Sequence, residues 1–223
     1  MLDWSPIWLS LKLATITTIL LFIVATPISY WMSFSRSKLK PLISTLVSMP
    51  LVLPPTVIGF YLLIVFSPTS WLGSSLKSLF GLKLVFSFEG LVFASMIYSL
   101  PFMVQPIQSG FAGLPANLAE ASAVLGKNRL VTLFRVLLPN ISTSIITALV
   151  LTFAHTIGEF GVVLMIGGNI PGETQVVSIA IYDHVEGMEY ENAHWLSAGL
   201  LLLSFLMLMT VYGVNRRFRL VQA

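Results

Sequence analysis

Five long apolar stretches set the limits on what this chain can form. They cover approximately residues 9–32, 42–66, 88–108, 141–167 and 195–214. A helix needs about 20 apolar residues to cross the hydrocarbon core of a bilayer, and each stretch reaches that length. Only 9% of the residues are charged, whereas soluble domains carry about 25%, so the chain could not cover a surface in water. We therefore predict one all-α membrane domain, residues 1–223, with about five transmembrane helices.

Basic residues indicate how the chain is oriented in the membrane. Nine of the twelve lysines and arginines lie in three clusters, which follow the first, the third and the fifth apolar stretch. Such clusters argue for topology signals rather than nucleic-acid binding. They are Arg36, Lys38, Lys40, Lys127, Arg129, Arg135, Arg216, Arg217 and Arg219. With five spans all nine fall on one side, and the positive-inside rule assigns that side to the cytoplasm. We predict an external N-terminus and a cytoplasmic C-terminus.

Closely spaced prolines interrupt the second apolar stretch. Pro50, Pro54 and Pro55 each lack the backbone N–H that a helix uses, and each leaves a carbonyl group without its usual donor. At membrane depth such breaks are tolerated where the backbone packs on protein or lines a polar path. A simple packing kink is the alternative. Three prolines so close together favour a moving or path-lining segment, and we take Pro54, Pro55 and Thr56 as pathway candidates.

A long connection, residues 111–139, follows the third apolar stretch on the predicted cytoplasmic side. Its first half contains Pro115, which suits the first turn of a helix, then several alanines, and then Gly126, which suits a helix end. Apolar residues at helical spacing predict a second short helix after it. They are Leu130, Leu133, Phe134 and Leu137. A short helix with small side chains on this face could enter a groove on another protein.

The same connection resembles the permease signature of ABC importers. The matching residues are Glu120, Ala121, Ser122 and Gly126, followed by Val136, Leu138 and Pro139. The sequence departs from the usual pattern at Ser122, where the family has alanine, and at Val136, where it has isoleucine. The resemblance implies a type I importer permease fold, in which this loop docks on an ATPase. It also implies a homodimer with two cytoplasmic ATP-binding cassette subunits and an external oxyanion-binding protein.

Two further segments resemble molybdate permeases. One is residues 49–59, with its double proline, and the other is residues 157–161 followed by residues 168–174. Sulfate permeases share part of the second pattern, but the double proline and Ile-Pro-Gly-Glu-Thr favour molybdate. The resemblance implies import of molybdate across a bacterial inner membrane by alternating access. Tungstate, sulfate and thiosulfate remain alternative cargoes.

Glu159 is the one carboxylate that we place within a membrane span, because Glu89, at the edge of the third stretch, falls at the outer interface. Burying a charge there costs at least a few kcal/mol, and His155 lies one helical turn earlier, where the two side chains could face each other. We interpret Glu159, with Gly158, Phe160 and Gly161, as a gate or a helix-clamping network. A purely structural pair is the alternative. Because like charges repel, Glu159 is not predicted to contact an anionic substrate.

No catalytic residue, cofactor or metal site is predicted. The sequence has no phosphate-binding Gly-Lys-Ser/Thr loop, so ATP is expected to be hydrolysed on a separate subunit. Residues 183–194 hold two histidines and four carboxylates, which we interpret as a solvated face or a docking surface rather than a metal site. An intramembrane hydrolase using a serine, His155 and Glu159 is a distant alternative, as is a membrane subunit without transport activity.

Overall fold

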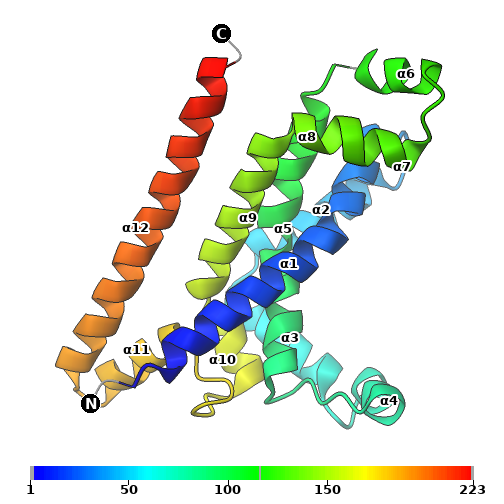
Figure 1. The fold of residues 1–223 in the computed structure, drawn as a ribbon. Coiled ribbons are helices and arrows are strands. Elements are labelled where there is room, and N and C mark those ends of the chain that lie inside the picture. Colours follow the sequence, from blue (N-terminus) through cyan, green and yellow to red (C-terminus); the bar gives the residue numbers. More distant parts are fainter. Residues whose placement is uncertain (1–2, 116, 222–223) are drawn as a thin grey trace.

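The computed structural model describes residues 3–115 and 117–221, and every regular element in them is a helix (Figure 1). Three helices are long and apolar enough to cross a membrane: α1 (Ser5–Phe34), α5 (Phe88–Ala112) and α12 (Tyr190–Val221). Two bent helix pairs bring the number of spans to as many as five, if each pair counts as one. They are Lys40–Leu51 with Pro55–Phe66, and Arg129–Asn140 with Ser142–Ile157. The all-α membrane fold with about five spans is confirmed.

The second apolar stretch forms a broken span rather than one helix. It contains α2 (Lys40–Ser48), a 3-10 turn at Met49–Leu51 and α3 (Pro55–Phe66), and the two arms meet at 110°. A residue before proline is driven towards extended backbone, and Pro54 has a ψ of 138°. Helix α3 can therefore begin only at Pro55, where a missing N–H costs nothing. The short helix α4 (Trp71–Phe80) follows it.

The fourth apolar stretch is also broken, at a point the sequence did not reveal. Helix α9 (Ser142–Ile157) ends before Gly158, and α10 (Gly161–Gly167) begins after Phe160. Helix α11 (Val177–Glu186) then lies at the same end of the bundle as the start of α1 (Figure 1). Glu159 therefore lies in an irregular link between two helices, and not within a helix as predicted.

The connection between α5 and α9 forms the predicted short helices at the opposite end of the bundle. They are α6 (Asn117–Val124), α7 (Arg129–Thr132), a π-helical turn at Leu133–Leu137 and α8 (Leu138–Asn140). Pro139 explains the π turn, because its ring has no N–H and would clash with the carbonyl group four residues earlier. In this turn the N–H of Leu138 donates to the carbonyl of Leu133, five residues back. The ends of α1 and α12 lie at this same end (Figure 1).

Helix α5 forms the centre of the packing. Helices α1, α9 and α10 lie against it, while α10 also packs on α3. Serine hydroxyls tie α1 to α5: Ser29 donates to the carbonyl of Val104, and Ser33 to that of Gln108, which is a common way of joining helices in lipid. Helix α12 packs against α9 and α11, and side chains such as that of Phe205 on it are exposed.

Candidate functional site

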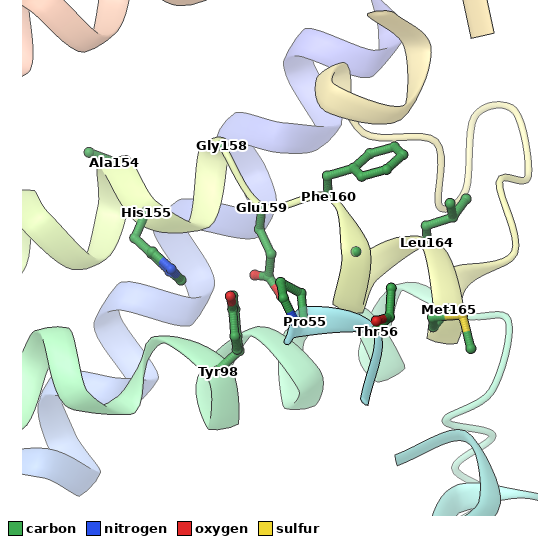
Figure 2. Close-up of a pocket in the computed structure, with 11 residues that line it drawn as sticks. Pro55, Thr56, Tyr98, Ala154, His155, Gly158, Glu159, Phe160, Leu164 and Met165 are labelled. Atoms are coloured by element: carbon green, nitrogen blue, oxygen red, sulfur yellow. The ribbon is translucent and has the colours of Figure 1, made fainter. Parts of the chain in front are cut away.

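A pocket of about 530 Å³ opens where the two broken spans meet (Figure 2). Its walls come from the start of α3, the middle of α5, the end of α9 and the start of α10. The lining residues are Pro55, Thr56, Tyr98, Ala154, His155, Gly158, Glu159, Phe160, Gly161, Leu164 and Met165. The structure thus brings together six of the seven predicted pathway candidates from two distant segments. The seventh, Pro54, is the residue that precedes α3.

Glycines allow the two broken spans to approach so closely. A Cβ atom on Gly59 of α3 would lie 2.7 Å from the Cβ of Met165 on α10. A Cβ atom on Gly161 would lie 2.8 Å from the Cβ of Pro55. Both distances are shorter than real carbon contacts, so any larger residue would separate α3 from α10. The wall of the pocket depends on these two positions.

Glu159 is buried in this pocket. Its side chain is 4% exposed, and among the described residues neither carboxyl oxygen has a hydrogen-bond partner. Figure 2 shows the side chain reaching from the link between α9 and α10 towards Pro55 and Tyr98. The backbone of the link is fixed by Ser178 on α11, whose hydroxyl donates to the Glu159 carbonyl at 2.5 Å.

His155 does not form the pair with Glu159 that the sequence suggested. Its Nδ1 lies 2.9 Å from the hydroxyl oxygen of Ser99 on α5, and its ring stacks on Phe102 with centroids 4.0 Å apart. No hydrogen bond joins it to Glu159 within the described part of the chain. The prediction failed because α9 ends at Ile157, so the helical spacing that would align residues 155 and 159 is lost.

Two residues around the pocket were missed from the sequence. Tyr98 lines it, and Ser178 holds its link. Tyr98 lies one helical turn after Ser95 on α5, so the spacing of these two polar residues was a usable signal. Ser178 is distant in sequence from the other residues of the pocket, and no sequence pattern indicated its role.

The signature residues of the cytoplasmic loop sit on an exposed short helix. Glu120 and Ala121 are exposed, whereas Ser122 is buried. Gly126 has a φ of +69°, and the Lys127 N–H donates to the Ser122 carbonyl, so the predicted glycine helix end is confirmed as a Schellman motif. Beyond the small residues the helix ends in two large apolar side chains, Val124 and Leu125, which are 87% and 74% exposed.

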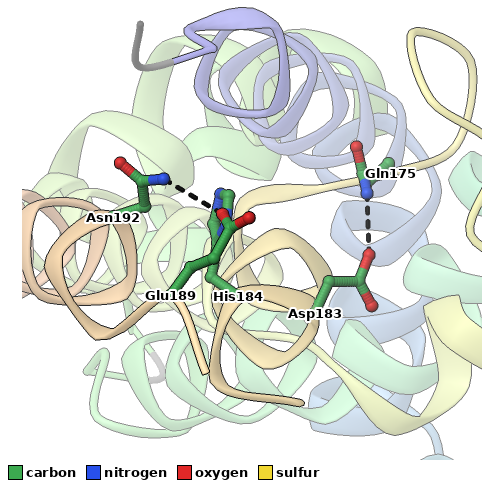
Figure 3. Close-up of polar contacts among 5 residues, drawn as sticks. All are labelled: Gln175, Asp183, His184, Glu189 and Asn192. Carbon is green, nitrogen blue, oxygen red and sulfur yellow. Dashed lines mark hydrogen bonds and ion pairs between the residues drawn. The ribbon is translucent and has the colours of Figure 1, made fainter. Parts of the chain in front are cut away.

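The outer loop between α10 and α11 is held by its amide and hydroxyl side chains. The amide of Asn169 donates to both carboxyl oxygens of Asp183, at 3.0 and 2.8 Å, and that of Gln175 donates to the same carboxylate at 2.8 Å (Figure 3). The buried Thr174 hydroxyl donates to the Gly167 carbonyl. Asn169 and Thr174, which carried part of the resemblance, therefore shape this loop.

The acidic outer segment forms local contacts. His184 Nδ1 lies 2.8 Å from a carboxyl oxygen of Glu189, and Asn192 donates to the same oxygen (Figure 3). The bonds from Asn192 and His184 hold the pKa of Glu189 below its ordinary value. Residues 3–115 and 117–221 contain no group of three or more His, Cys, Asp or Glu side chains placed to hold a metal ion.

Comparison with protein families gives one match over nearly the whole chain. Residues 10–219 match the family described as the binding-protein-dependent transport system inner membrane component. The chain is 50% identical over 218 residues to a molybdenum transport system permease protein of Azotobacter vinelandii. That alignment covers 97% of this chain and 96% of the relative.

Other similarities are more distant. The chain is 30% identical to a probable sulfate transport system permease protein of Prototheca wickerhamii, over 91% of this chain and 79% of that one. Among solved structures, a chain of an inward-facing methionine ABC transporter superposes with a TM-score of 0.72 at 16% identity, covering 97% of this chain and 95% of that one. At such low identity this likeness supports the fold alone.

Proposed function

The chain belongs to the family of binding-protein-dependent transport system inner membrane components, and from this premise we propose that it carries molybdate into the cell as the permease subunit of an ATP-driven importer. The observation that carries the proposal is the 50% identity, over 97% of the chain, to a molybdenum transport permease. The protein is a multi-pass inner membrane component and a transport subunit, so its task is to provide a path rather than to perform a chemical reaction.

Sulfate is the rival cargo, since a probable sulfate permease is also a relative. Molybdate and sulfate are both tetrahedral dianions. A protein therefore cannot distinguish them by charge and must distinguish them by size. A rigid external binding protein with fixed donors can measure that difference better than a weakly polar path. The higher identity to the molybdenum permease favours molybdate, with tungstate as the closest competitor.

The partners follow from the same proposal. A symmetric dimer would place the path on a two-fold axis, and the incompletely covered face of α12 leaves apolar surface for lipid or a second copy. Two ATP-binding cassette subunits would bind at the end that carries α6, and a solute-binding protein at the end that carries α11. That places the N-terminus outside and the C-terminus in the cytoplasm.

The pocket around Glu159 is the proposed gate of the path. Two broken helices at membrane depth meet there, and such breaks are tolerated where backbone packs on protein or lines a cavity. Thr56 and Tyr98 offer neutral hydroxyl groups, which can donate to an oxyanion without binding it tightly. In alternating access the two states differ in how they bind their ligands. The non-helical link at residues 158–160 is where α10 could move relative to α9.

The α6 helix is the proposed contact with the ATPase. Glu120 and Ala121 are exposed on it, Gly126 ends it, and Val124 and Leu125 present apolar surface at its tip. Closure of the ATPases on ATP would draw the two copies of α6 together and open the path outwards. Hydrolysis would then return the path to its inward-facing state.

Uptake measurements test the cargo. Cells that lack this chain should lose high-affinity uptake of radiolabelled molybdate, and excess tungstate should compete in wild-type cells far better than excess sulfate. Loss of sulfate uptake with molybdate uptake intact would reject molybdate as the cargo, but it would still be consistent with an importer permease.

A reporter fused after Ala223 tests the orientation of the chain in the membrane. It should be active only in the cytoplasm, and activity outside the cell would reject the predicted topology.

A further inference from the structure

A short chain of hydrogen bonds links the α6 helix to α7. Ser122 Oγ and Thr132 Oγ1 lie 2.7 Å apart, and the Thr132 hydroxyl donates to the Asn128 carbonyl at 3.0 Å. A hydroxyl group has one proton to donate, so Ser122 must be the donor and Thr132 the acceptor between them. The two residues are only 5% and 8% exposed, and Ser122 is the buried residue of an otherwise accessible helix.

We propose that Ser122 and Thr132 are positioning residues that fix α6 to the base of α9, so that a displacement of α6 reaches the pocket around Glu159. This inference rests on the proposed role of α6 as the contact with an ATPase. It assigns a role to Ser122 that the alanine of the usual signature could not perform, since alanine has no hydroxyl group.

The path from Thr132 to the pocket is continuous along the chain, although it bends by 78° where α9 begins. Thr132 is followed directly by the π turn Leu133–Leu137, and Leu137 is buried in the core beside Ile141. Helix α9 begins one residue later and ends at the link that carries Glu159. Close-packed interiors transmit strain rather than absorb it. The hydroxyl pair secures the first step of the path, where α6 could otherwise pivot about the loop at Gly126.

The direction of the hydrogen bonds makes the two single substitutions unequal. In S122A, Thr132 keeps its own bond to the Asn128 carbonyl, and no buried donor loses its partner. In T132V, the Ser122 hydroxyl is left buried with no acceptor, which is the more costly outcome. In the double variant neither hydroxyl remains, so the penalty of T132V should be relieved. Two substitutions that act independently of each other would instead give additive effects.

The experiment uses the full chain assembled with its ATPase and binding protein in lipid vesicles. The readout is the number of molybdate ions carried per ATP hydrolysed, measured for the wild type, S122A, T132V and the double variant. The matched control is T147V, which also removes a threonine hydroxyl, but one whose bond lies within α9. We expect T132V to lower the ratio by about two- to tenfold, S122A to lower it less, and the double variant to resemble S122A. T147V should match the wild type.

Amide hydrogen exchange of residues 117–124 tests the hydroxyl pair without transport. Exchange should be faster in T132V than in the wild type and unchanged in T147V. An unchanged transport ratio in T132V, an equal fall in T147V, or a double variant worse than both single ones would overturn the proposal. If the wild type carried no molybdate, the proposed function would be rejected. Faster amide exchange in T132V would even then support the role of the hydroxyl pair in holding α6.

Discussion

Gly161 at the start of α10 lies so close to Pro55 at the start of α3 that a Cβ atom on the glycine would be 2.8 Å from the proline Cβ. The two residues are 106 positions apart in the chain, yet this contact joins the breaks of two spans. It sets the distance between the half-helices that form the wall of the pocket. The position therefore offers a direct test of whether the pocket depends on this close approach.

We expect Gly161→Ala to destabilise the fold. The added methyl group must push against a proline ring that cannot rotate away, and overpacking of this kind costs about 1–3 kcal/mol. The measurement is the thermal unfolding temperature of the purified protein in detergent. Gly199→Ala on α12 is the control, because a Cβ atom there would have nothing within 4 Å. Equal unfolding temperatures for both variants would mean that α3 and α10 are not held together at this point.

The helix end at Gly126 gives a second prediction, which separates backbone conformation from bulk. Its φ is +69° and a Cβ atom would meet nothing within 4 Å, so size is not the restriction. Left-handed backbone costs ordinary residues about 1–2 kcal/mol, but asparagine adopts it more readily. Gly126→Val should therefore reduce molybdate transport strongly, while Gly126→Asn should retain most of it.

The readout for these variants is uptake into vesicles, with membrane insertion checked by the amount of chain recovered. Equal activity of the valine and asparagine variants would show that the backbone of this helix end does not matter for coupling. If both variants lost transport, a partner would have to contact position 126 so closely that no side chain fits there.

Glu159 gives a third prediction, because its carboxyl group is buried and, among the described residues, has no hydrogen-bond partner. Glutamine has the same shape and cannot ionise, so the substitution removes the desolvation cost of a charge on this buried group. We expect Glu159→Gln to unfold at the same or a higher temperature than the wild type. A clear fall in unfolding temperature would show that the carboxylate has a partner that only the assembled protein supplies.

The sequence was sufficient for the main architecture. Apolar length predicted the spans, the prolines at 50, 54 and 55 predicted the broken second span, and Gly126 predicted the end of the loop helix. These features are local: each depends on a few neighbouring residues and on rules of backbone geometry. The resemblance to importer permeases, carried by the signature around Glu120, is confirmed by the family match over residues 10–219.

Long-range and conformational details could not be predicted. No proline marks the break at residues 158–160. His155 and Glu159 were therefore assigned to one helix face. Ser122 was treated as a size substitution for alanine, because nothing in the sequence shows that a turn brings Thr132 within 2.7 Å of it. The roles of the coupling and pathway residues remain predictions for the experiments described above.

The last prediction concerns Asp183, whose carboxylate accepts three N–H contacts from Asn169 and Gln175. Hydrogen bonds to a charged group contribute about 1.5–3 kcal/mol, and these tie the loop between α10 and α11 to the α11 helix. Asp183→Asn would turn an NH2 group towards N–H donors, so we expect a lower unfolding temperature and faster amide exchange over residues 169–176. Glu186→Gln is the control on the same helix, because its bond is to the exposed Tyr182 hydroxyl. The two variants should differ clearly; if both left the exchange rates unchanged, the outer loop would be held by its buried Thr174 rather than by Asp183.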